Sequence, residues 1–163
     1  MKKSSKRTPR PIRINAHLTV INGQKPLSQA DKIYLFKQAI KSLNSMQFGV
    51  NLSTADFTCL CDMVNISLLL TEKDIGREYL DELYQAREGM QEAKQRYIKT
   101  SKLGFNATEL KAVKVALTIH QAQIDICTLK EFSDAFDEQE KRIAKGDFYK
   151  REGDLSVNER KAA

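Results

Sequence analysis

Positively charged side chains dominate the beginning of the sequence and are its strongest candidates for chemistry. The first 30 residues contain seven Lys and Arg and no acid. The whole chain carries 27 Lys and Arg against 21 Asp and Glu, so the rest of it is almost neutral. Basic side chains on an extended segment neutralise phosphates and release counterions. The segment therefore predicts contacts with nucleic acid or another partner by Lys2, Lys3, Lys6, Arg7, Arg10 and Arg13.

A second basic stretch lies between positions 94 and 114, where Glu109 is the one acid. The aromatic residues Tyr97 and Phe105 lie within it, and aromatic rings beside positive charge can stack on bases. The alternative is improved solubility and favourable charge at a helix C-terminus. No helix-turn-helix, zinc finger or RNA-recognition motif is recognisable, so the predicted binding is unspecific. The candidate residues of this stretch are Lys94, Arg96, Lys99, Lys102, Lys111 and Lys114.

A stretch of opposite charge follows near the end of the chain, within positions 131–140. An acidic face repels nucleic acid, so such a ligand would approach from elsewhere. The same face could instead meet a basic protein, or it could simply be an exposed helix surface. The five acids are Glu131, Asp134, Asp137, Glu138 and Glu140.

Residues for catalysis, metal binding or nucleotide binding are scarce. The sequence has two histidines and no glycine-rich phosphate loop. His120 interrupts an apolar row, which favours a core histidine that makes a hydrogen bond. Cys59 and Cys61 point to different faces of a helix and make a poor metal pair, and an odd number of cysteines indicates a reducing compartment. We therefore predict a protein that is not an enzyme and has neither a metal nor a cofactor.

Helical periodicity in the body of the chain predicts an all-α fold, an antiparallel bundle of about five helices. Ser28 caps a helix that reaches about position 46, and Ser53 or Thr54 starts the second. Thr71 and Asp74 open a third helix that continues to Tyr97. The last two helices are expected at 106–127 and 128–146.

The 106–127 helix is predicted to lie at the centre of this bundle. Asn106 and Glu109 form a capping-box pattern at its start. Apolar residues occupy two rows, one through Leu110 and Val113 and one through Val115 and Ile119, which leave a narrow polar stripe. A helix that is apolar around most of its circumference must be surrounded by others.

The division of the chain follows from these patterns: a basic arm over 1–27, a helical domain over 28–146, and a polar tail over 147–163. Within the arm, residues 12–20 alternate between apolar and polar side chains, the period of a half-buried strand. No partner strand follows the Asn22-Gly23 turn. The segment could lie on the bundle, pair with a second copy in a homodimer, or add to the sheet of a partner.

The opening KRTPRPIRIN and the late stretch TELKAVKVALTIHQAQIDICT resemble a group of uncharacterised small helical proteins of Gram-negative bacteria. Phages, plasmids and prophage regions carry these proteins. The resemblance spans nearly the whole chain and implies a bacterial cytoplasm, a mobile element and no site residues.

No apolar run approaches the length of a membrane span. Two functions are expected: nucleic-acid binding, or a protein-binding regulator or inhibitor of a host defence or conjugation complex.

Overall fold

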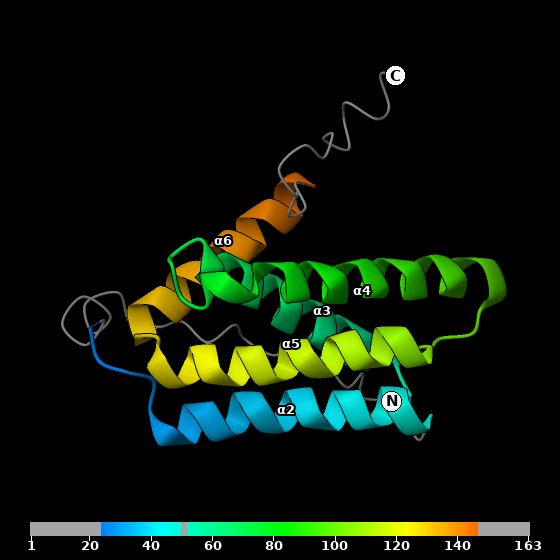
Figure 1. Cartoon of the computed structure of the whole chain (residues 1–163), viewed down its shortest axis with the longest axis horizontal. Helices are drawn as coiled ribbons and strands as arrows, with labels where there is room; N and C mark the ends of the chain where they lie inside the picture. Colours follow the sequence, from blue (N-terminus) through cyan, green and yellow to red (C-terminus); the bar gives the residue numbers. More distant parts are fainter. Residues whose placement is uncertain (1–23, 50–51, 147–163) are drawn as a thin grey trace, which may run out of the picture.

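The computed structural model describes residues 24–49 and 52–146, and five α-helices lie in these ranges (Figure 1). The predicted all-α class is confirmed there, with an isolated bridge between Pro26 and Thr128 and no strand. The segments predicted as most of the arm, 1–23, and as the tail, 147–163, lie outside the described residues. The helices are α2 (Gln29–Phe48), α3 (Thr54–Thr71), α4 (Leu80–Thr100), α5 (Ala107–Ile126) and α6 (Leu129–Lys145), with a 3-10 turn η1 (Arg77–Tyr79) before α4.

Polar caps fix where the helices begin, as the sequence predicts. The Ser28 hydroxyl accepts a hydrogen bond from the Asp31 amide at 3.2 Å. Ser53, Asn106 and Thr128 each form a capping box, in which the acid three residues later accepts from the backbone amide of the cap. These side chains satisfy backbone donors that have no partner inside a helix.

The predicted start of the third helix at 71–74 is wrong. Thr71 is the last residue of α3, and a loop precedes η1. In this loop Asp74 and Gly76 have φ of 61° and 73°. Gln123 of α5 holds the loop, because its side-chain amide donates to the carbonyls of Ser67 at 3.0 Å and Ile75 at 2.8 Å. A tertiary contact from a distant helix therefore decides a boundary that the local sequence does not show.

The helix at the centre of the bundle is α3, and the prediction that 106–127 is central is wrong. Helix α3 packs against all four other α-helices, whereas α5 packs mainly against α2, α3 and α4. From Ile66 to Thr71 every residue of α3 is buried. Among the described helices, α3 alone has the length and apolar composition to cross a membrane, and half of this helix is buried inside the protein. The core helix of a bundle has the same composition.

Helix α5 exposes much of the second apolar row predicted to be buried. Val115 is 38% exposed and Ile126 is 70% exposed. Ile33 of α2, and Phe136 and Ile143 of α6, are exposed as well. These positions lie at the flank of their helices, beyond the neighbouring helix, because each outer helix meets too few neighbours to be covered on all sides.

Successive helices from α2 to α5 run in alternating directions, and α6 leaves the bundle at an angle (Figure 1). The C-terminal end of α5 meets the starts of α2 and α6 at one end of the molecule. A second apolar cluster fills this end, with Leu27, Leu70, Ile124 and Cys127 among its buried members. The bridge between Pro26 and Thr128 closes over it.

The predicted core histidine is confirmed at the contact between α3 and α5. The Nδ1 atom of His120 lies 2.8 Å from the Ser67 hydroxyl oxygen, and both residues are buried. Burial lowers the pKa of His120 to about 4, because the charged imidazolium would lose its hydration.

His120 should make the protein less stable in acid. An unfolded chain binds a proton at His120 near its ordinary pKa of 6.5, whereas the folded chain does so only near 4. Neutral His120 therefore makes its full contribution to the free energy of unfolding above pH 6.5. Roughly 3 kcal/mol of this free energy is lost as the pH falls from 6.5 to 4. Urea unfolding between pH 7 and pH 4 measures it. In His120→Gln the loss over this range should be smaller by that amount; an equal loss in both proteins would contradict the assignment.

Candidate nucleic-acid interface at the α4–α5 junction

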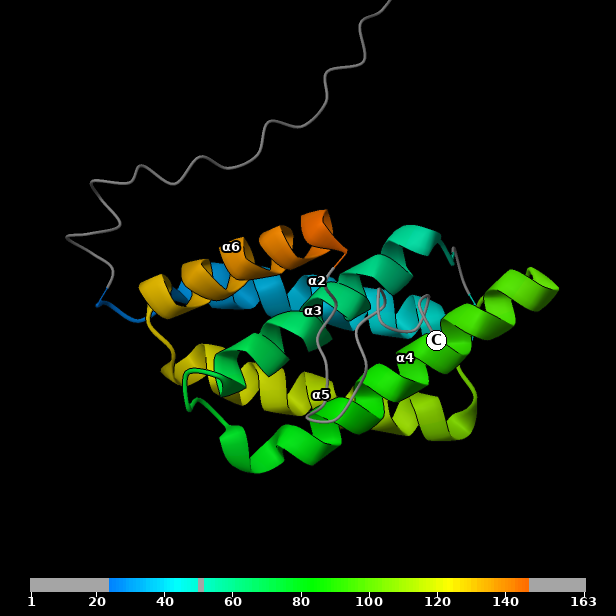
Figure 2. The same cartoon turned by 90° about the horizontal axis from the view of Figure 1, so that it is seen from above.

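The last turns of α4 extend beyond the first turn of α5, so the basic stretch lies on a projecting end of the molecule (Figure 2). Ser101 ends α4 in the left-handed conformation, and its amide donates to the Tyr97 carbonyl at 2.8 Å. The chain then reverses over 102–106, and Asn106 caps α5. We call this region the α4–α5 junction.

A paired Arg96 and Glu109 hold the junction together. The Arg96 guanidinium donates to the two Glu109 oxygens at 2.8 and 2.6 Å and to the Gly104 carbonyl at 2.7 Å. The Glu109 carboxylate also accepts from the Asn106 amide at 2.8 Å. The hydrogen bond from Arg96 holds the pKa of Glu109 below its ordinary value, although its side chain is only 2% exposed. The one acid of the stretch is thus neutralised by Arg96, and the guanidinium of Arg96 is occupied within the protein.

Helices α4 and α5 lie close together at Gly89. This residue is buried in the middle of α4, and a Cβ atom there would lie 3.4 Å from the Cα of Glu109, which is an ordinary van der Waals contact. An alanine would therefore fit at this position, whereas a longer side chain would meet Glu109 and disturb its contact with Arg96.

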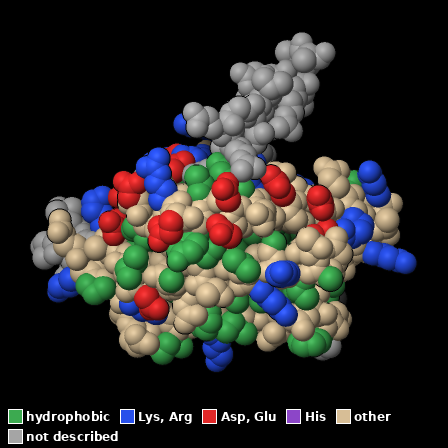
Figure 3. Space-filling view, viewed as in Figure 1, with side chains coloured by type: hydrophobic (Ala, Val, Ile, Leu, Met, Phe, Trp, Pro, Cys, Tyr) green, Lys and Arg blue, Asp and Glu red, His purple; other side chains and the backbone are tan. Residues whose placement is uncertain are grey.

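The five lysines of the stretch are all exposed, and no ion pair within the described ranges involves them. Lys94 and Lys99 point about 140° apart around the helix. Burial raises the pKa of the Cys61 thiol to about 12, and the charge of Lys94 opposes this rise, so Lys94 lies on the α3 side. Positive side chains gather at the junction end and over α5 in Figure 3. We call the remaining four the junction lysines: Lys99, Lys102, Lys111 and Lys114.

The two aromatic residues of the stretch have different surroundings. Phe105 packs against Phe57 of α3, with ring centroids 6.2 Å apart, and is partly buried in the main core. Its role is to anchor the junction. Tyr97 is 37% exposed, and its ring alone of the two could contact a base. The predicted contacts from Lys2 to Arg13 lie outside the described residues.

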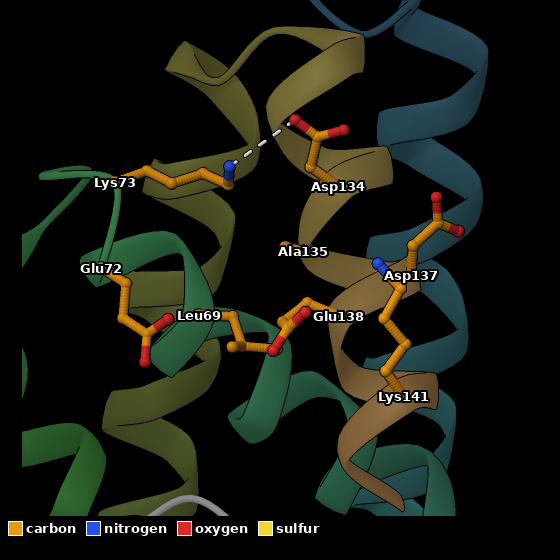
Figure 4. A pocket seen from close by; sticks show the side chains of 8 residues that line it. All are labelled: Leu69, Glu72, Lys73, Asp134, Ala135, Asp137, Glu138 and Lys141. Atoms are coloured by element: carbon orange, nitrogen blue, oxygen red, sulfur yellow. Dashed lines mark ion pairs between the residues drawn. The ribbon is translucent and has the colours of Figure 1, made fainter. Parts of the chain in front are cut away.

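The acidic stretch lies on α6, and two of its five acids, Asp134 and Glu138, form ion pairs with described residues. A pocket of about 360 Å³ between α6 and the end of α3 is lined by Leu69, Glu72, Lys73, Asp134, Ala135, Asp137, Glu138 and Lys141 (Figure 4). Asp134 pairs with Lys73 at 3.6 Å and with Lys130 at 2.6 Å. Glu138 and Glu72 each pair with Arg142 at 3.0 Å. The end of α3 that forms this pocket is the end away from the α4–α5 junction (Figure 1).

Other reactive residue types are buried or dispersed in the described part. Cys127 is fully buried, and desolvation raises the pKa of its thiol to about 11. His120 faces Ser67 in the core rather than a cavity. Within residues 24–49 and 52–146 no three His, Cys, Asp or Glu side chains converge to hold a metal ion. The junction therefore remains the candidate site of the described residues.

Sequence reasoning missed the pairing of Arg96 with Glu109 and the role of Gln123. A signal for the pairing exists, because Glu109 lies four residues before Val113 and eight before Leu117, on the buried row of α5. A carboxylate on such a row needs a cation from a neighbouring helix. Gln123 also occupies a buried position, but the carbonyls that it binds lie about 50 residues away and leave no local pattern.

No protein-family model matches the chain, and neither a curated protein nor a solved structure matches it. The resemblance to proteins of mobile elements therefore stays an expectation. Any functional interpretation depends on the geometry and charge of the junction itself.

Loss of the Arg96 side chain should destabilise the protein, while the four junction lysines keep their charges. Arg96→Ala leaves the buried Glu109 carboxylate without its cation, at a cost of about 3 kcal/mol, near the low end for a buried pair because Arg96 is partly exposed. Urea unfolding at pH 7 measures this cost. Lys99→Ala, three residues away and exposed, should change stability by less than about 0.5 kcal/mol. Similar values for the two variants would contradict a structural role for Arg96.

Proposed function

We propose that this protein is not an enzyme and that it binds the phosphate backbone of nucleic acid through the junction lysines and the basic arm. One observation carries the proposal. Four exposed lysines lie within the 16 positions over which α4 passes into α5, and the acid among them is buried against Arg96. Because that acid is neutralised inside the protein, the positive field at the surface is not cancelled.

The chemistry of lysine favours contact with phosphates over recognition of a base sequence. An ammonium group is a compact point charge, whereas bidentate recognition of a base edge needs the planar donors of Arg, Asn or Gln. Contacts to phosphates position a protein on nucleic acid but carry no sequence information. The proposed binding is therefore salt-dependent and shows little preference for sequence.

The distribution of charge also sets the direction of approach. The acids of α6 lie on the part of the molecule away from the junction, and Asp137 and Glu140 are exposed there. Nucleic acid would be repelled by this side and attracted by the other. The arm adds six Lys and Arg within residues 1–23, and in this proposal their charge adds to the attraction of phosphates.

Removal of three junction lysines should weaken nucleic-acid binding and its dependence on salt. In Lys99→Gln/Lys102→Gln/Lys111→Gln three phosphate contacts are lost, so the slope of log K against log salt should fall by about 2 to 3. Fluorescence anisotropy with a labelled 20-nucleotide strand and the matching duplex, over a salt series, measures this change.

A control triple variant tests whether position or net charge matters. Lys37→Gln/Lys41→Gln/Lys145→Gln removes the same charge from exposed lysines of α2 and α6 and should keep most of the slope. Equal losses in the two variants would show that only net charge matters. Absence of salt-dependent binding in the wild type would overturn the proposal. If a host protein is then captured from nuclease-treated lysate, the chain acts instead as a regulator or inhibitor.

Deletion of residues 1–11 should weaken binding while the folded domain keeps its stability. The deletion removes five Lys and Arg and no residue of the described helices. We expect a large loss of affinity at low salt and an unchanged melting temperature by circular dichroism. A truncated protein that binds like the intact one would remove the arm from the proposed interface.

A further inference from the structure

Helix α6 carries a row of apolar side chains that the rest of the described chain leaves uncovered. Phe132, Phe136 and Ile143 are separated by four and seven residues and therefore share one side of the helix. Phe132 packs against the apolar cluster at the start of α6. Further along, Phe136 is 44% exposed and Ile143 is 51% exposed, because they lie beside the side of α6 that packs on α3, where Ala135 and Gln139 are buried.

The described chain begins beside this row. The Leu129 amide donates to the Lys25 carbonyl at 2.8 Å, and Pro26 forms a bridge with Thr128. Leu27 is buried in the cluster that contains Phe132. The segment that precedes Gln24 must therefore start at the first turn of α6, close to the apolar row.

The segment that precedes Gln24 has an apolar pattern that suits this row and is long enough to cover it. Residues 12–20 alternate strictly, so an extended backbone would place all of its apolar side chains on one side. They are Ile12, Ile14, Ala16, Leu18 and Val20. Nine extended residues span roughly 30 Å, whereas the row from Phe132 to Ile143 spans about 17 Å along the helix.

We propose that residues 12–20 dock in extended form along the Phe136 and Ile143 side of α6, with their apolar side chains against the helix. The chain would run from the start of α6 toward its end. The polar side chains of the segment face water.

This contact goes beyond the proposed binding of nucleic acid, and it fixes where the basic residues emerge. Residues 2–10 would leave the protein near the end of α6 rather than at the root of the arm. The contact is measured without nucleic acid, so its failure and the failure of the proposed function are separate results.

Hydrogen exchange of the full-length chain tests the contact. Backbone amides of residues 12–20 should exchange at least about tenfold more slowly than in an unstructured peptide. Phe136→Ser/Ile143→Ser should bring exchange to within about threefold of the peptide rate. Exposed side chains tolerate such changes, and an unchanged melting temperature verifies the fold.

Two controls make each outcome decisive. Tyr34→Ser/Ile98→Ser replaces apolar residues that are 62% and 65% exposed on other helices, and it should leave residues 12–20 protected. Ile14→Ser/Leu18→Ser changes only the arm and should speed exchange at positions 136–143. The proposal is overturned if residues 12–20 exchange like a free peptide in the wild type, or if their protection survives Phe136→Ser/Ile143→Ser. Protection that rises with protein concentration would also overturn it, because a second copy of the chain would then cover the segment.

Discussion

The need to cover α3 is the constraint on which the rest of the structure depends. Every residue of α3 from Ile66 to Thr71 is buried, and most of them are apolar, so water is excluded only if other helices surround this part. Each of the other four α-helices packs against it. Hydrogen bonds then fix how α5 lies on α3, because His120 meets the Ser67 hydroxyl and Gln123 meets the Ser67 carbonyl. Apolar burial brings these helices together, and two polar contacts select one alignment.

Features encoded by neighbouring residues could be predicted from the sequence. The helical class, the caps at Ser28 and Asn106, and the buried His120 all follow from local patterns and are confirmed. The identity of the central helix could not be predicted, because two helices have apolar rows and only tertiary packing decides which is enclosed. Ile126 and Ile143 illustrate the same point, since a helical row does not show where its neighbour ends.

The candidate site could be predicted in composition but not in geometry. The count of positive charges between 94 and 114 locates the junction, whereas the structure separates three roles within it. Arg96 neutralises Glu109 inside the protein, Lys94 lies toward α3, and the other four lysines are exposed. The different directions of Lys94 and Lys99 follow from helical spacing, so this part could be predicted from the sequence. The role of Arg96 depends on the close approach of α4 and α5 at Gly89 and has no counterpart in the local sequence.

The bridge between Lys25–Pro26 and Thr128–Leu129 has a mechanical consequence. Tension applied to the N-terminal segment meets this bridge before it reaches α2, because the Lys25 carbonyl is held by the Leu129 amide and Leu27 is buried just beyond. The load passes to the start of α6, about 100 positions later in the chain. A partner that pulls on the leading segment would therefore strain the contact between the segment before α2 and the start of α6, while the α4–α5 end stays unloaded.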